Sequence, residues 1–338
     1  MILKLKRKLL GTTIVCWVLL FVVVADIKAQ EVDIFQEIDQ SILRNDTTAM
    51  NQALIEILYN SDDENKIFES TQLLIENGLK VNYKDSTGKT ALHYATKRQE
   101  EFLPIIKYLL KQGADINMVD NIGNTPLIYC AYSLFFYYEE EIVKFLIDSG
   151  ADLNVVGLKG SLLHIVTNHW SGSKTELDRI EYLIHKGADV NVSDANGWTP
   201  IFCAVDRGAN DIVELLITMG ADIAKVDKYG NTPFHYAANV DLVKLFVEKG
   251  CNIDAINKKG NTLLHELAYW ENSFYESSQW RNSEWVRERK TDLVKKLIEL
   301  GADISIANNK GQTALDIFKM EYDKKNEHDL LKLFKGDK

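Results

Sequence analysis

One pattern of apolar and polar positions recurs seven times along the chain. In each copy a short apolar run with helical spacing ends at a glycine, and a second glycine follows ten residues later. These pairs use most of the 19 glycines, so glycine marks fixed positions of the pattern. The pairs are Gly78/Gly88, Gly113/Gly123, Gly150/Gly160, Gly187/Gly197, Gly220/Gly230, Gly250/Gly260 and Gly301/Gly311.

The spacing of these pairs indicates the architecture. The steps from one pair to the next are 35, 37, 37, 33, 30 and 51 residues. A period of about 33 residues is typical of a solenoid, in which supersecondary units stack on their neighbours. The long last step indicates an insertion.

Each unit reads as a helix, an extended exit, a tight turn and the start of a second helix. The first glycine closes a helix C-terminus. A polar residue three before the second glycine suits the turn. Thr two after that glycine, or Ser one after it in the fourth copy, is expected to cap the next helix through its hydroxyl. The turn residues are Asp85, Asp120, Asp194, Asp227, Asn257 and Asn308, and the capping residues are Thr90, Thr125, Ser161, Thr199, Thr232, Thr262 and Thr313.

The two ends of the array differ from its middle. The stretches "TAMNQALIEILYN" and "NKIFESTQLLIENG" predict two helices without an opening hairpin, which suits an N-terminal cap. We therefore divide the chain into capping helices with a first partial repeat (30–84), six repeats (85–306) and a C-terminal capping repeat (307–338).

The helix starts read "KTALHYA", "NTPLIYCA", "WTPIFCAV", "NTPFHYAA" and "NTLLHELA", and helix exits read "GADIN" or a variant. This unit resembles the ankyrin repeat, over about residues 48–335. The resemblance implies an all-α repeat solenoid of stacked helix–turn–helix pairs, joined by short β-hairpin loops, with a concave binding face. The fourth copy, "GLKGSLLHIV", lacks the turn Asp and the Pro, so we expect its helices but a different hairpin.

Residues 1–29 are predicted to be a signal peptide. Lysine and arginine in "MILKLKRKLL" precede the uncharged run "GTTIVCWVLLFVVVA", with cleavage expected after Ala25 or Ala29. The alternative is an uncleaved membrane anchor formed by residues 9–24. We expect export to the periplasm or the medium, and no membrane contact after signal removal.

The charge of the chain bears on its partners, and the positions of its cysteines bear on its core. The formal charge is −10, and removal of residues 1–29 takes away five basic residues and one acidic one, which makes the charge more negative by four. An acidic surface repels phosphate backbones, so nucleic acid is not an expected partner. Cys130, Cys203 and Cys251 stand at repeat-core positions, where we expect buried thiols apart from one another.

The histidines are interpreted as structural. His93, His164, His235 and His265 each stand three residues after a capping residue, where a neutral imidazole can bridge adjacent turns. The sequence has no H-E-x-x-H, C-x-x-C, phosphate-loop or G-x-S-x-G motif. We therefore predict no metal site, no cofactor and no enzymatic activity.

Insertions form a first candidate binding surface. Three copies lengthen the junction between their helices, at 132–141, 167–176 and 269–290, and such insertions fall on one edge of a solenoid. They are rich in aromatic residues, which interface hot spots favour; packing as local core is the alternative. The candidate residues are Phe135, Phe136, Tyr137, Tyr138, Trp170, Trp270, Phe274, Tyr275, Trp280 and Trp285.

The hairpin tips form a second candidate surface. From the fourth copy onward, lysine recurs at the tips, which would favour acidic or phosphorylated segments of a partner. The alternative is that these side chains are simply solvated. The candidate residues are Lys159, Lys228, Tyr229, Lys258 and Lys259.

The sequence as a whole predicts an exported, non-catalytic protein that binds a partner protein through its concave and hairpin face or through its aromatic insertion edge. A monomer is expected. The alternatives are a membrane-tethered regulator and an inhibitor or immunity-type protein that blocks a toxin or an enzyme.

Overall fold

The structure is a computed structural model of the 338-residue chain. The chain divides into two compact units, unit 1 (Met1–Asp152) and unit 2 (Leu153–Lys338). The predicted signal segment 1–29 lies outside the described residues. Those residues are 38–334 without positions 40, 43, 45, 62, 99, 135–139, 169–172, 274–283 and 323–332.

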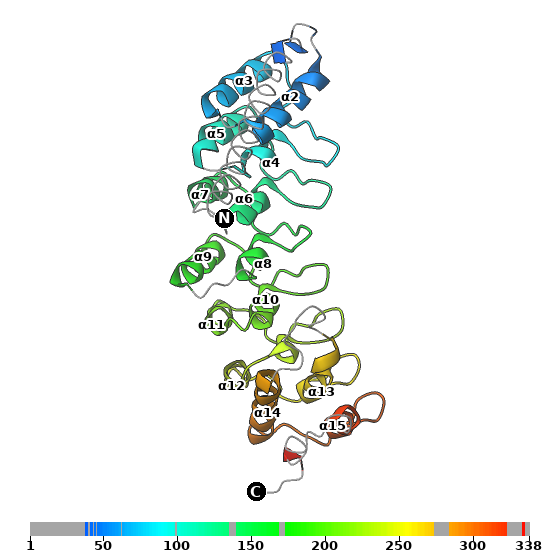
Figure 1. Ribbon diagram of the computed structural model, residues 1–338. Helices are drawn as coiled ribbons and strands as arrows, with labels where there is room; N and C mark the ends of the chain where they lie inside the picture. Colours follow the sequence, from blue (N-terminus) through cyan, green and yellow to red (C-terminus); the bar gives the residue numbers. More distant parts are fainter. Residues whose placement is uncertain are drawn as a thin grey trace, which may run out of the picture. The chain divides into compact units, whose positions relative to one another are not determined.

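Unit 1 forms two rows of helices, with loops that project to one side (Figure 1). In the first row α2 contacts α4 and α4 contacts α6, and in the second row α3 contacts α5. The bounds are α2 Thr47–Asn60, α3 Glu64–Glu76, α4 Ala91–Ala95, η1 Glu100–Phe102, α5 Leu103–Lys111, α6 Pro126–Leu134 and α7 Glu140–Asp148.

Unit 2 follows the same plan. Its first row is α8, α10, η2, α13 and α15, and its second row is α9, α11, α12 and α14, with each element in contact with the next in its row. The bounds are α8 Leu162–Thr167, α9 Lys174–His185, α10 Pro200–Asp206, α11 Asn210–Thr218, η2 Pro233–Tyr236, α12 Val240–Glu248, α13 Leu263–Ser273, α14 Glu284–Glu299 and α15 Ala314–Tyr322.

The core lies between the two rows of each unit. Leu92 of α4 and Ile106 of α5 are fully buried in unit 1, as are Ile201 of α10 and Leu216 of α11 in unit 2. Strand-like pairing within the described residues is limited to isolated bridges in two loops. The predicted all-α repeat fold is therefore confirmed.

The turn residue of each hairpin is fixed by hydrogen bonds to its own loop. Oδ1 of Asp85 accepts the backbone N–H groups of Thr87 and Lys89, at 2.8 and 2.9 Å. The fourth copy instead pairs Gly157 with Gly160 through two backbone hydrogen bonds of 3.1 Å, so its expected difference is confirmed. The other turn residues repeat the Asp85 pattern, and they are Asp120, Asp194, Asp227, Asn257 and Asn308.

Close stacking of hairpins explains the second glycine at Gly88, Gly197, Gly230 and Gly260. In unit 1 the Asn121 N–H donates to the Thr87 carbonyl oxygen at 3.0 Å. Gly88 has φ of +80°, and a Cβ built on it would lie 2.6 Å from the Asn121 nitrogen. A side chain at position 88 would therefore both strain the backbone and separate the two hairpins.

Buried imidazoles link neighbouring repeats. Nδ1 of His93 accepts the Thr90 N–H at 3.0 Å, so the ring proton is on Nε2, which donates to the Asn124 carbonyl oxygen at 3.1 Å. This confirms the predicted structural role. The same pair of bonds is made by His164, His235 and His265, which reach the carbonyl oxygens of Trp198, Asn261 and Gln312.

The sequence suggested that the hydroxyl of the capping residue alone caps each helix, but in some copies a histidine side chain shares this role. At Thr125 it accepts the backbone N–H of Ile128 at 3.3 Å, as expected. At Thr90 it lies 2.9 Å from the Nδ1 of His93, so the ring shares the capping role. At Thr199 the hydroxyl is buried and has no hydrogen-bond partner among the described residues, and Phe202 stands where four other copies have histidine.

Asparagines after the helix exits form another link between repeats. In unit 2 the Nδ2 of Asn191 donates to the Gly220 carbonyl oxygen at 3.0 Å, and its Oδ1 accepts the Asp222 N–H at 2.8 Å. The equivalent position in the next repeat is Ala224, which has no side chain able to make these bonds. The same double link is made by Asn82 and Asn117 in unit 1 and by Asn154 in unit 2.

One expectation about the cysteines is wrong. The three described cysteines form no disulfide, and Cys130 and Cys203 are buried as expected, but Cys251 is half-buried. Cys251 follows Gly250 at a position where other copies have a buried alanine, such as Ala188.

Among the helices of the described residues, none is both long enough and apolar enough to cross a membrane.

We expect Ala224→Asn to stabilise the protein, because the new side chain can reach the Gly250 carbonyl oxygen and the Asn252 N–H as Asn191 does one repeat earlier. The free energy of unfolding should rise by about 1 kcal/mol, the net value of a typical hydrogen bond. Urea unfolding measures it. Ala195→Asn, at an exposed hairpin tip, is the matched control and should change stability little; equal effects of both would contradict the link.

The four linking histidines should make stability fall in mild acid. Burial is the main cause that lowers the pKa of each imidazole below its usual 6.5, against the opposing effect of the carbonyl bond. The unfolded chain therefore binds more protons below about pH 6.5, and stability is lost as pH falls from there toward the lowered pKa.

Urea midpoints between pH 7.5 and 5 measure this dependence. His235→Phe should weaken the dependence on pH while lowering stability at pH 7.5, because the bond to the Asn261 carbonyl is lost. An unchanged pH profile in this variant would show that other groups cause the acid sensitivity.

Candidate functional site

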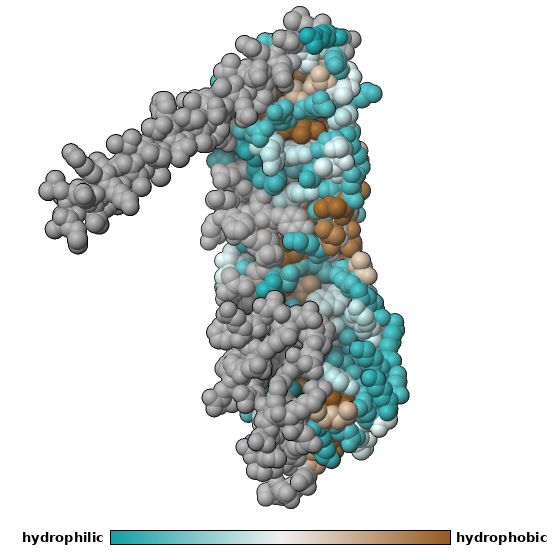
Figure 2. All heavy atoms as spheres, turned by 45° about the vertical axis from the view of Figure 1, so that its right-hand side comes forward, coloured by the Kyte–Doolittle hydropathy of each residue, from teal (hydrophilic) through white to brown (hydrophobic). Residues whose placement is uncertain are grey.

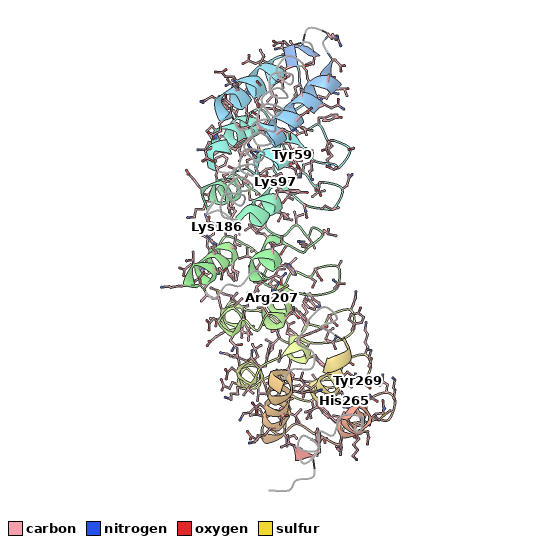
Figure 3. All side chains as sticks on the ribbon, viewed as in Figure 1. Tyr59, Lys97, Lys186, Arg207, His265 and Tyr269 are labelled. Atoms are coloured by element: carbon pink, nitrogen blue, oxygen red, sulfur yellow. The ribbon has the colours of Figure 1, made fainter. Side chains whose placement is uncertain are left out.

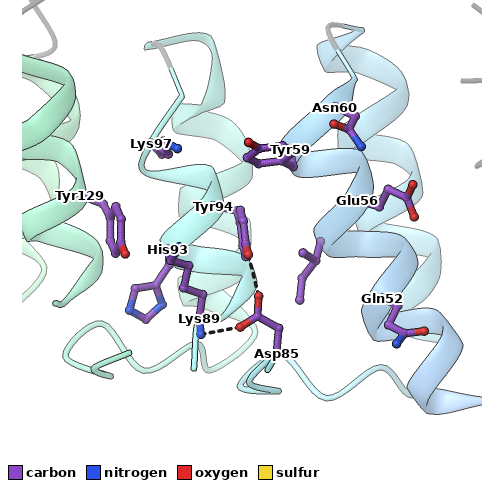
Figure 4. Close-up of a pocket in the computed structure, with 11 residues that line it drawn as sticks. Gln52, Glu56, Tyr59, Asn60, Asp85, Lys89, His93, Tyr94, Lys97 and Tyr129 are labelled. Carbon is purple, nitrogen blue, oxygen red and sulfur yellow. Dashed lines mark hydrogen bonds between the residues drawn. The ribbon is translucent and has the colours of Figure 1, made fainter. Parts of the chain in front are cut away.

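A groove of about 580 Å³ opens on the first-row side of unit 1. It lies between α2 and α4 and extends over the first hairpin to α6 (Figure 4). Charged, amide and aromatic side chains line it together. The lining residues are Gln52, Ile55, Glu56, Tyr59, Asn60, Asp85, Lys89, His93, Tyr94, Lys97 and Tyr129.

A short hydrogen bond fixes the middle of the groove. The Tyr94 hydroxyl donates to Oδ2 of Asp85 at 2.6 Å, while Oδ1 of Asp85 accepts three bonds from Thr87 and Lys89. Desolvation opposes ionisation of Asp85, but these bonds outweigh it and lower the pKa of the carboxyl below its usual value. Desolvation and the bond to Asp85 raise the pKa of Tyr94 to about 12, so its hydroxyl stays protonated as a donor.

Lys89 places a positive charge beside two aromatic rings. Its Nζ lies 5.8 Å from the ring centroid of Tyr94 and 5.2 Å from that of Tyr129. Tyr129 is itself held by its hydroxyl, which donates to Oδ2 of Asp120 at 2.6 Å. The two rings are thus fixed by the turn residues of successive hairpins, and they hold the ammonium by cation–π attraction.

Tyr59 forms the exposed end of the groove. Its side chain is 57% exposed and meets Tyr94 edge to face, with ring centroids 6.1 Å apart. Nζ of Lys97 lies 5.6 Å from the Tyr59 ring centroid, and the two residues lie next to each other in Figure 3. Exposed tyrosine beside lysine is suited to binding, since tyrosine buries a large area with few rotatable bonds.

The site is arranged for binding and offers little for catalysis. Both ring nitrogens of His93 are engaged, with Thr90 and with the Asn124 carbonyl oxygen, so the imidazole cannot accept a proton without losing a structural bond. Across the part of the chain that the structure describes, no group of three or more His, Cys, Asp or Glu residues could hold a metal ion.

Unit 2 repeats the hydrogen bond but covers the tyrosine. The Tyr236 hydroxyl donates to Oδ2 of Asp227 at 2.6 Å, as at Tyr94. Trp198 stands at the position equivalent to Lys89, and its ring packs 5.3 Å from Tyr236 and 5.7 Å from Phe202. An apolar ring therefore occupies the place that carries a charge in unit 1.

The hairpin-tip residues predicted from the sequence all belong to unit 2 and are all exposed. Nζ of Lys228 donates to Oδ1 of Asn196 and lies 5.0 Å from the Tyr229 ring centroid, and Nζ of Lys258 donates to the Lys228 carbonyl oxygen. These lysines therefore also tie neighbouring tips together. Lys159 and Lys259 complete the set, whose binding role stays a prediction.

The same hairpins expose apolar residues among the polar ones. Figure 2 shows apolar atoms on the face that the hairpins form, between hydrophilic atoms. In unit 2 the exposed aliphatic side chains of the hairpins are Val156, Leu158, Val226 and Ile256. Scattered exposed residues of this kind need no functional explanation.

The aromatic insertion surface cannot be placed from this structure. Trp270 belongs to α13 and Trp285 to α14, but their side chains lie outside the described part of the chain. The remaining candidates lie outside the described residues altogether, and they are Phe135, Phe136, Tyr137, Tyr138, Trp170, Phe274, Tyr275 and Trp280.

Sequence reasoning missed the unit 1 groove, although one signal pointed to it. Lys89 precedes the capping residue of its repeat, and it is the one charged residue among the seven at that position. The others are Asn124, Gly160, Trp198, Asn231, Asn261 and Gln312.

Comparison with known proteins gives the family. A family model described as ankyrin repeats (3 copies) matches residues 41–156 and 163–257, more than half of the chain. A Fowlpox virus protein named for its ankyrin repeats is 37% identical over 73 residues, which are 22% of this chain and 38% of that protein.

Two other relatives carry the same kind of name. A protein of Acanthamoeba polyphaga mimivirus is 37% identical over 68 residues, 20% of this chain and 9% of that protein. A Rickettsia conorii protein is 43% identical over 49 residues, 14% of this chain and 70% of that protein. The chain thus aligns with much less than two thirds of the two viral proteins.

Proposed function

Because the chain belongs to the ankyrin repeat family, whose members are generally protein-interaction modules, we propose that it is an exported, non-catalytic protein that binds a partner protein. The binding surface is the first-row and hairpin face of unit 1, where the groove lies. The observation that carries this proposal is the exposed Tyr59, set beside Lys97 and backed by the fixed ring of Tyr94.

Preorganisation supports binding at this face. The Tyr94 ring is held by Asp85, and the Asn121 N–H bonds the neighbouring hairpin through the Thr87 carbonyl oxygen. A surface whose side chains are already ordered loses less conformational entropy when a partner docks. A few aromatic anchors can then supply most of the affinity.

Export is part of the proposal because of the N-terminal pattern. Basic residues followed by a short uncharged apolar run and small residues are the features of a signal peptide. The half-buried Cys251 is then the described thiol most exposed to an oxidising compartment.

Tyr59→Ala should weaken capture of the native partner at least about tenfold, as expected for an aromatic anchor. The immobilised full chain is incubated with the envelope fraction of the source cells, and captured proteins are quantified by mass spectrometry. The urea midpoint should change little, because Tyr59 is 57% exposed.

Leu73→Ala is the matched control, since Leu73 is an exposed apolar residue of α3 in the second row. Undiminished capture by Tyr59→Ala would contradict binding at this face. If deletion of residues 274–283 abolished capture while Tyr59→Ala did not, the insertion edge would be the binding surface.

N-terminal sequencing of the protein recovered from the producing cells tests export. Cleavage by signal peptidase should give a mature chain that starts at Asp26 or Gln30. An intact Met1 on exported protein would identify residues 9–24 as a membrane anchor, and retention in the cytoplasm would contradict the proposed location.

A further inference from the structure

Lys89 is the one charged residue among the seven that stand directly before a capping residue. Six of the seven residues that precede a capping residue are uncharged, and in unit 2 the equivalent Trp198 covers Tyr236 of the next repeat. Lysine at this position keeps the groove open and places an ammonium in its wall. Lysine at this position therefore lets the groove bind a different kind of ligand from the one that a tryptophan there would allow.

The Lys89 ammonium lies beside two aromatic rings but is not paired with a carboxylate in the part of the chain that the structure describes. Its contacts within the described residues are the two aromatic rings at 5.8 and 5.2 Å, and no carboxylate there lies within ion-pair distance. The nearest turn carboxylate, Asp85, is already engaged by four hydrogen bonds. Lys89 as a residue is half-buried. A cation in a partly desolvated place attracts an anion from outside the chain, because low polarity strengthens the attraction.

We propose that the groove binds an extended acidic segment of the partner protein, whose Asp or Glu carboxylate pairs with Lys89 over the rings of Tyr94 and Tyr129. This inference deepens the proposed function and rests on it. The carboxylate enters between the first and second hairpins, and the neighbouring ligand residues run along α2 past Tyr59.

The wall opposite Lys89 suits a peptide backbone. Gln52, Glu56 and Asn60 are exposed and follow each other at four-residue spacing, so they lie in one line along α2. Eight residues of helix span about 12 Å, which is the length of about four residues of extended chain. Amide and carboxylate groups in that line can bond successive peptide N–H and C=O groups of the ligand.

The charges of the groove favour a carboxylate over a phosphate. Lys89 and Lys97 are balanced by Glu56 and Asp85, so the lining has no net charge. A phosphate carries up to two negative charges and is usually held by several cations or by arginine forks. A single carboxylate needs one cation and meets less repulsion from Glu56.

Two pools of blocked nonapeptides test the proposal. The central residue is Glu in one pool and Gln in the other, and the flanking positions are randomised among Ala, Ser, Thr, Val and Tyr. Each pool is passed over the immobilised full chain, and retained peptides are quantified by mass spectrometry. The Glu pool should be retained about tenfold more than the Gln pool, which corresponds to the loss of one charge-assisted contact.

Variants connect this preference to the groove. Lys89→Met keeps the apolar stem over the rings and removes the charge, so it should abolish the preference for Glu. Lys80→Met, an exposed lysine of unit 1 outside the groove, should leave it unchanged. Urea midpoints of both variants show that each still folds.

Equal retention of the two pools, or a preference for Glu that survives Lys89→Met, would overturn the proposal. Displacement of the Glu peptides by about 10 mM inorganic phosphate would also overturn it, since the site would then take a free anion. If the native partner is captured through Tyr59 but the Glu pool is not preferred, the acidic segment is wrong and the proposed function stands. If the Glu peptides are retained but no native protein is captured, the proposed function is contradicted and the peptide preference of the groove is not.

Discussion

The hydrogen bond from a buried imidazole to a carbonyl oxygen of the next repeat sets how each unit is assembled. In unit 1 His93 fastens α4 to the second hairpin, while its other nitrogen closes the first turn of its own helix. A single neutral ring thus satisfies a helix terminus and an interface between repeats. Because both of its nitrogens are engaged, an imidazole in this position cannot take up a proton without losing a bond of the assembly.

The bond between the turn residue and the following helix shows how the repeats can change residues while the turn residue keeps its hydrogen bond. Asp85 receives a hydroxyl hydrogen from Tyr94, whereas Asn257 donates from its amide to Glu266 at 2.8 Å. Donor and acceptor have exchanged places, but the bond between turn and helix remains. In unit 2 the exchange extends the network, because the amide of Asn257 also reaches Asn231 in the preceding repeat. Buried polar networks of this kind are stabilising only when every member is satisfied.

Local chemistry explains why most of the fold could be predicted. Three features can be recognised in the sequence of a single repeat: a glycine at a positive φ, an aspartate at a tight turn and an apolar helical stripe. The repeat period then predicts that these units stack. The groove depends on contacts between repeats, so Lys89 shows its role only when Tyr94 and Tyr129 are placed on either side of it. The half-buried Cys251 was missed for a similar reason, since the free space beside it is set by neighbouring elements.

The junction between α10 and η2 is joined by different forces from its neighbours. Phe202 supplies no imidazole bond there, and the rings of Trp198 and Phe202 pack against Tyr236 in its place. Apolar packing loses strength as water cools, whereas the junctions made by His164 and His235 depend on directed polar bonds. Cold should therefore weaken this aromatic contact more than the imidazole bonds at the neighbouring junctions of unit 2.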